Sequence, residues 1–150
     1  MKMTRAVKYA TDAVCELATA TGNRPQASHT IARARKIPER FLLKVLKPLA
    51  DRKILLSLKG PNGGYRLARP AKDINLLEVI EAVDGPITGS VPDDEGEESS
   101  STTIRLHKVF DTISANDRAA LRSITFAYLA SDSAGKRAGK PAKATAGKGK

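Results

Sequence analysis

The side chains with the clearest chemistry in this sequence are the charged residues that open a predicted helix at Pro38. Glu39, Arg40 and Lys44 lie outside its apolar positions, so helical spacing turns them outward. An arginine can donate two hydrogen bonds to guanine, and a glutamate can accept one from cytosine N4. On an isolated helix such charges usually form only a solvated face. The neighbouring elements therefore decide between that interpretation and base recognition.

A second group with the same chemistry lies in a predicted β-hairpin directly after this helix. The segments 54–58 and 65–68 favour strands, and the glycine-rich turn KGPNGG separates them. A basic hairpin tip can contact phosphates or enter the minor groove, whereas in an ordinary hairpin the glycines serve turn geometry alone. The candidate DNA contacts here are Lys59, Asn62, Gly63, Gly64 and Arg66.

A third group comprises polar residues that precede the charged helix. Lys2, Arg5 and Lys8 stand at the start of a first helix, and Thr30 stands in a second. Such groups typically contact phosphates, which adds affinity without reading sequence. A basic helix followed by a basic hairpin predicts a winged helix-turn-helix, in which DNA is contacted at two places.

The elements that must position these side chains are helices with a regular apolar period. We expect helices at 4–20 and 29–36, the second with Ser28 as N-cap. In the third helix, which opens at Pro38, the apolar stripe is Phe41, Leu42, Val45, Leu46 and Leu49. Pro48 removes one helical hydrogen bond, so we expect this helix to kink or loosen near Lys47.

A fourth helix is predicted at 76–83, where Asn75 and Glu78 form a capping box and Gly85 closes the helix in the left-handed conformation. The helical period returns at Ile104 and continues to 124. Its apolar stripe, interrupted by Asp117, consists of Leu106, Phe110, Ile113, Ala120 and Ile124. A long helix outside a compact domain with one apolar stripe is a candidate for dimerisation.

The overall expectation is a mainly α fold with a small β-hairpin and a long C-terminal dimerisation helix. The pattern predicts a winged helix-turn-helix domain at 1–85, a flexible acidic loop at 86–103, a dimerisation helix region at 104–134 and a disordered basic tail at 135–150. The 26 Lys and Arg residues outnumber the 16 Asp and Glu residues, and both ends of the chain are basic. This charge distribution favours a polyanion partner, with double-stranded DNA first.

Several classes of function are disfavoured by the same residues. No nucleophile motif or phosphate-binding loop is present, so an enzyme is not expected. The single Cys15 excludes an intramolecular disulfide, and we expect a buried structural thiol. His29 and His107 have no metal-ligand spacing, so neither metal nor cofactor is predicted. The sequence shows no apolar span, which favours a cytoplasmic, nucleoid-associated protein without membrane contact.

Several stretches together resemble the Rrf-two family of bacterial winged-helix repressors. These are the run from Ile37 to Leu42, the hairpin KGPNGGYRLARP, the helix INLLEVIEAVDG and the late SITFAYLA. The resemblance covers roughly residues 1–130. It implies a homodimer that binds an inverted repeat in promoters, and base reading by the residues that match Pro38, Glu39 and Arg40. Cluster-binding members carry three cysteines where 86–103 has none, so an iron–sulfur cluster is not expected.

Two other functions stay open. A weakly specific architectural protein would bind any duplex through the basic tail, and a protein-interaction module would not bind DNA at all. A regulator of this type also needs a signal. An unknown small molecule, a partner protein or Cys15 oxidation could supply it, and the sequence favours none of them.

Overall fold

The computed structural model describes residues 1–92 and 99–137, with side chains as far as residue 132, and shows a mainly helical fold with one β-hairpin. The predicted fold class is confirmed. In chain order the elements are α1 Arg5–Ala18, η1 Thr21–Asn23, α2 Ser28–Arg35, α3 Glu39–Asp51, β1 Leu55–Leu58, β2 Gly64–Leu67, η2 Ala71–Asp73, α4 Leu76–Asp84, α5 Ser101–Arg122 and α6 Phe126–Arg137. The acidic run 93–98 and the tail from 138 lie outside the described residues.

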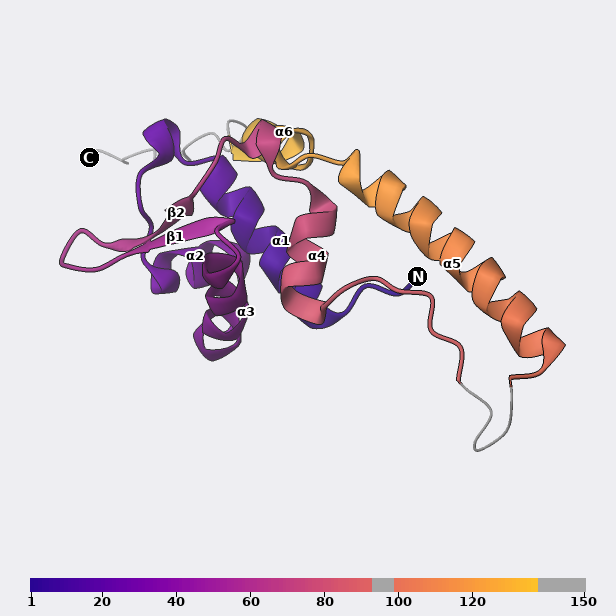
Figure 1. The fold of residues 1–150 in the computed structure, drawn as a ribbon. Helices are drawn as coiled ribbons and strands as arrows, with labels where there is room; N and C mark the ends of the chain where they lie inside the picture. The colour runs from indigo at the N-terminus through magenta and orange to yellow at the C-terminus, as the bar shows by residue number, and fades with distance from the viewer. Residues whose placement is uncertain (93–98, 138–150) are drawn as a thin grey trace, which may run out of the picture.

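The core forms around α1, which packs against α2, α3, α4 and α6 (Figure 1). Val7, Ala10, Val14 and Leu17 recur along one face of α1, and all four are buried. Helices α2, α3 and α4 turn their own apolar positions towards that face. Phe126 of α6 is fully buried in the same cluster, so a helix from the end of the chain completes the core of the winged-helix unit.

The hairpin is fastened to the segment between α1 and α2. Strands β1 and β2 are antiparallel, and Gln26 forms a further bridge with Tyr65 through backbone hydrogen bonds of 2.8 and 2.9 Å. The Asn23 side chain both donates to and accepts from the backbone of Leu67. These contacts orient the hairpin relative to the start of α2, which precedes α3.

The predicted boundary signals of α4 are confirmed at its N-terminus. Asn75 accepts from the Glu78 backbone N–H, and the Glu78 carboxylate accepts from the Asn75 N–H, which completes the capping box. At the other end Gly85 has φ +85° but ψ 178°. The glycine therefore closes the helix with a positive φ in an extended conformation, and the prediction of a left-handed helical residue is wrong.

Two expectations for the helix-turn-helix need correction. Ser28 belongs to α2 itself, because Ala27 takes the N-cap position and the Ser28 hydroxyl is bonded elsewhere. Helix α3 continues through Pro48 to Asp51. Although Pro48 lacks an N–H, its carbonyl accepts from Arg52, and the helix on both sides is held by buried leucines. The expected loosening near Lys47 does not interrupt the helix.

The C-terminal region also differs from its prediction. Helix α5 begins at Ser101, where Ser100 caps it, and ends at Arg122. Ile124 lies in the connection to α6, where its carbonyl accepts from Leu76 and its side chain packs on the chain's own core. The single helix predicted at 104–124 is therefore wrong at both ends. Helix α6 extends to Arg137, so the tail predicted from 135 begins with helix.

No helix among the described residues is long and apolar enough to cross a membrane. Figure 1 shows instead that α5 projects from the helical core as an arm, and it contacts that core mainly through α4.

Candidate nucleic-acid interface

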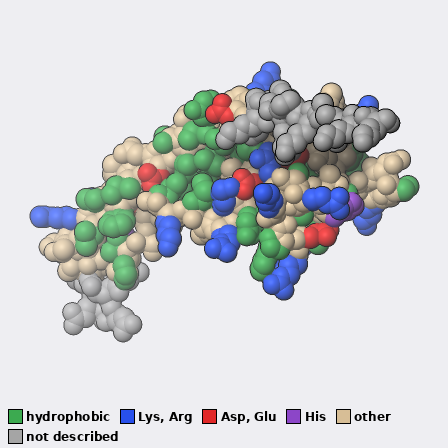
Figure 2. Space-filling model, turned by 180° about the vertical axis from the view of Figure 1, so that it is seen from behind, with side chains coloured by type: hydrophobic (Ala, Val, Ile, Leu, Met, Phe, Trp, Pro, Cys, Tyr) green, Lys and Arg blue, Asp and Glu red, His purple; other side chains and the backbone are tan. Residues whose placement is uncertain are grey.

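The basic face of α3 is the centre of the candidate interface. Leu42, Val45, Leu46 and Leu49 are buried on one side, which leaves the opposite side to solvent. Glu39, Arg40, Lys44 and Lys47 are all exposed there. Figure 2 shows Lys and Arg side chains gathered over the winged-helix part of the molecule. The first two turns of α3 therefore present cations and a carboxylate in the order that the sequence predicted.

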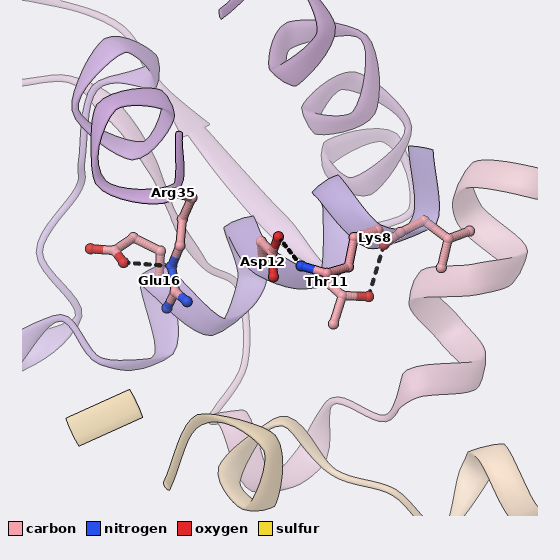
Figure 3. A network of polar contacts seen from close by, with 6 residues as sticks. Lys8, Thr11, Asp12, Glu16 and Arg35 are labelled. Carbon is pink, nitrogen blue, oxygen red and sulfur yellow. Dashed lines mark hydrogen bonds and ion pairs between the residues drawn. The ribbon is translucent and has the colours of Figure 1, made fainter. Parts of the chain in front are cut away.

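Two polar contacts link α2 to its neighbours, one to α3 and one to α1. The Ser28 hydroxyl donates to Glu39 Oε1 at 2.8 Å, which joins the start of α2 to the start of α3. At the other end of α2, Arg35 forms an ion pair with Glu16 of α1 at 2.8 Å (Figure 3). Glu16 is only 3% exposed. Breaking a buried pair leaves an uncompensated charge, so this contact strongly restrains the helix-turn-helix geometry.

Phe41 lies outside the apolar stripe that was predicted for it, because it is 38% exposed. Its neighbours on α3 already fill the core, and position 41 turns towards a cavity of about 280 Å³ between α1 and α3. The guanidinium carbon of Arg40 lies 4.7 Å from the ring centroid, and Lys44 Nζ lies 5.8 Å from it. The exposed ring therefore acts as a platform that orients both cations by cation–π attraction.

The hairpin residues divide into an exposed tip and an enclosed base. Lys59 and Asn62 are exposed, so both are available to DNA. A Cβ on Gly63 would lie 2.2 Å from the Leu58 carbonyl oxygen, so the close approach of the hairpin backbone alone accounts for a glycine at this position. Arg66 is half-buried, and its Nε is enclosed without a hydrogen-bond partner among the described residues. DNA contact by Gly63, Gly64 and Arg66 stays a prediction.

The N-terminal cations surround the start of α1. Lys2 and Arg5 are exposed, and Arg5 lines the cavity beside Phe41, which brings it close to α3. Lys8 is paired with Asp12 one turn further along α1 (Figure 3). Thr30 is exposed on α2. The structure thus places Arg5 next to the α3 face, whereas the charge of Lys8 is partly compensated.

The predicted dimerisation stripe on α5 is largely uncovered. Leu106, Phe110 and Ile113 are exposed, as is Ala120, which lies two turns beyond Ile113. Val109 is 52% exposed and adjoins the stripe, although the sequence analysis omitted it. Figure 2 shows hydrophobic side chains along this arm of the molecule. Ile124 does not join them, because it packs on the chain's own core.

The Cys15 thiol is buried in α1, as predicted. Burial raises the pKa of this thiol above its ordinary value, and the positive charge of Arg35 opposes that shift only in part. We expect alkylation of the native protein by iodoacetamide at pH 7.5 to be at least about tenfold slower than in urea, because a protonated, enclosed thiol is a poor nucleophile. Mass spectrometry of timed samples measures both rates. Equal rates would contradict this picture of the site.

The order of these elements, with a helix-turn-helix followed by a two-stranded wing, defines a winged-helix DNA-binding protein. The chain belongs to the Rrf2 (Rrf-two) family, whose model, described as "Iron-dependent Transcriptional regulator", matches residues 3–132. It is a DNA-binding transcriptional regulator and not an enzyme.

Individual relatives agree with this assignment. A helix-turn-helix transcriptional regulator of Mycobacterium tuberculosis is 32% identical over 87% of this chain and 81% of its own. The regulator IscR of Vibrio vulnificus is 28% identical over 88% of this chain and 79% of its own. The structure of CymR, the global cysteine regulator of B. subtilis, superposes with a TM-score of 0.71 at 26% identity, and the match covers 88% of this chain and 98% of that one.

Iron appears in the family description, so the donor atoms of this chain need to be compared with those that iron requires. Iron–sulfur clusters are held by several thiolates, whereas this chain has one cysteine, buried in α1. Within the described ranges 1–92 and 99–132, no group of three His, Cys, Asp or Glu side chains could hold a metal ion. His29 and His107 lie on different helices, α2 and α5. The donor set does not fit an iron–sulfur cluster.

Proposed function

We propose that this protein is a sequence-specific transcriptional repressor that binds an inverted-repeat promoter site as a homodimer, without an iron–sulfur cluster. The observation that carries the proposal is the exposed face of α3, where Glu39, Arg40 and Lys44 stand together on a helix braced by α2 and the wing. In helix-turn-helix proteins the start of this helix contacts base edges. Lys59 and Asn62 on the wing, with Lys2 before α1 and Arg5 at its first position, supply the flanking backbone contacts.

The exposed stripe on α5 supports the homodimer. Exposure of four large apolar side chains to water on one helix face is unfavourable in free energy, and a second copy of the same helix would cover them. These side chains are Leu106, Val109, Phe110 and Ile113. A two-fold dimer presents two α3 helices to the major groove, with half-sites about 34 Å apart or a multiple of that distance. The symmetry of the dimer then requires an inverted repeat.

Regulation without a cluster needs another signal. A small molecule or a partner protein that changes the dimer geometry would alter the separation of the two α3 helices and so the affinity for the operator. A place on the nucleoid in the bacterial cytoplasm follows from this function.

The proposal is tested by in vitro selection from a random duplex library at near-physiological salt. The full-length protein is compared with a variant in which Lys140, Lys143, Lys148 and Lys150 of the tail are changed to Gln. Enrichment of one inverted repeat by both proteins supports the proposal. Enrichment of no motif, with duplex binding lost in the variant, would favour a weakly specific architectural protein instead. If neither protein shows salt-sensitive binding to duplex DNA, a protein-interaction module is favoured.

Replacing Arg40 by Ala is expected to cost about 1–3 kcal/mol of binding free energy and to relax specificity at one base position. The reason is that a bidentate contact to guanine is lost. Competition with duplexes that differ at single positions measures both effects. Arg40→Lys is the control, because it keeps the charge but not the planar fork. A small loss that is uniform across all duplexes would contradict base reading by Arg40.

A further inference from the structure

The outward face of α3 carries one apolar residue among its charges. Leu43 follows Glu39 by four positions and precedes Lys47 by four, so helical geometry aligns these three side chains in one row. Leu43 is 43% exposed, whereas Leu42 and Leu46, its neighbours towards the core, are fully buried. Sequence reasoning missed this residue, although its place between two charged positions was visible in the helical spacing.

The charged neighbours of Leu43 already have partners within the chain. Glu39 accepts from the Ser28 hydroxyl at 2.8 Å. Lys47 forms an ion pair with Asp51 at 2.9 Å. Leu43 offers only methyl groups, and much of its surface stays open after the chain has packed.

Single exposed leucines are common on protein surfaces, so exposure alone says little. The position of Leu43 adds the second point, because it lies on the second turn of the helix that would enter the major groove. Lys44 and Lys47, the exposed cations on either side of Leu43, would hold that face against the DNA backbone. An apolar group held there meets base edges rather than solvent.

We infer that Leu43 is a specificity-determining residue that packs against the 5-methyl group of a thymine in each half-site. This methyl is the apolar group that base pairs present in the major groove, and side-chain methyls recognise it by contact. The inference rests on the proposed function, since it requires α3 to read bases. We therefore expect an A·T pair in the part of each half-site that the second turn of α3 contacts, with its thymine facing Leu43.

The test uses the operator that the selection experiment supplies. Each thymine of the half-site is replaced in turn by deoxyuridine, in both half-sites together, which removes the methyl and keeps the pairing hydrogen bonds. Fluorescence anisotropy at fixed salt measures binding of the full-length protein. At one position we expect a loss of about fourfold for each half-site, the value of one buried methyl group. Leu43→Ala should bind the thymine and deoxyuridine duplexes equally.

A matched control comes from the same face of α3. Lys47→Ala should weaken binding to both duplexes by the same factor and still distinguish thymine from deoxyuridine, because a phosphate contact carries no base information. Thermal unfolding of Leu43→Ala should match the original protein, since the side chain is exposed.

Three results would overturn the inference. The first is a selected half-site that has no thymine on either strand. The second is that no deoxyuridine replacement weakens binding. The third is that Leu43→Ala still binds the thymine duplex more tightly than the deoxyuridine duplex, by the same factor as the original protein. In each case the enriched inverted repeat still supports the proposed function. If no motif is enriched at all, the proposed function fails and the reading by Leu43 fails with it.

Discussion

Phe110→Glu is expected to separate the proposed homodimer into monomers and to lower its affinity for the proposed inverted repeat at least about 100-fold. Phe110 is 43% exposed at the centre of the α5 stripe. In a two-fold dimer the substitution places two like charges close to the symmetry axis, in an interface without water to solvate them. Sedimentation velocity gives the mass of the particle, and anisotropy with the selected operator gives the affinity.

The affinity loss follows from linkage between the half-sites. Two binding modules joined in one particle act at a high effective concentration, and separation of the modules removes that gain without changing any contact to DNA. Phe110→Glu should therefore bind a single half-site as well as the original protein does.

Ala119→Glu provides the matched control. Ala119 is exposed on α5 nine residues later, half a turn around the helix from Phe110, and carries the same new charge. This variant should remain dimeric and keep its affinity. If Phe110→Glu stays dimeric with unchanged affinity for DNA, the dimer interface lies elsewhere. If both variants are monomers, a negative charge anywhere on α5 disrupts the dimer, and the stripe around Phe110 has no special role in it.

The local features of the fold were predictable because each depends on residues close in sequence. The hairpin follows from two β-favouring runs around KGPNGG, and the capping box of α4 follows from the spacing of Asn75 and Glu78. The persistence of α3 through Pro48 was not predictable in this way. Buried leucines on both sides of Pro48 hold the helix, and that packing depends on α1 and α4.

In the candidate site, too, features that depend on local spacing were predictable, and features that depend on packing between distant elements were not. The exposed charges of α3 lie where helical spacing predicts them. Phe41 was assigned to the core, because periodicity alone does not show that Leu42 and its neighbours already fill the space against α1. Ile124 was assigned to the dimer stripe, but the backbone bridge between Asn75 and Thr125 draws it back onto the core. Long-range contacts of this kind leave no periodic pattern in the sequence.

Gly64→Ala is expected to lower the free energy of unfolding by about 3 kcal/mol, because it combines a strained backbone with a clash. Gly64 has φ +138°, and a Cβ there would lie 2.3 Å from the Gln26 carbonyl oxygen and 2.8 Å from the Ala27 nitrogen. All of these are backbone atoms, so no rotamer change relieves the contact. Urea unfolding followed by circular dichroism measures the loss.

Gly60→Ala separates the two causes. Gly60 also has a positive φ, +104°, but nothing lies within 4 Å of its Cβ position. This variant should lose only about 1 kcal/mol, the cost of the backbone strain alone. Equal losses in both variants would mean that the hairpin does not approach the Gln26 segment as closely as the structure shows.

The clash at Gly64 also has a consequence for DNA binding. Relief of the clash requires the Gln26–Tyr65 bridge to open, and Gln26 directly precedes the N-cap of α2. The wing and the start of α2 would then move apart, so the DNA contacts proposed for the wing would lose their fixed position relative to α3. Under conditions where both variants are folded, Gly64→Ala should therefore bind the operator more weakly than Gly60→Ala. Equal binding would show that the wing is positioned by its own two strands rather than by this bridge.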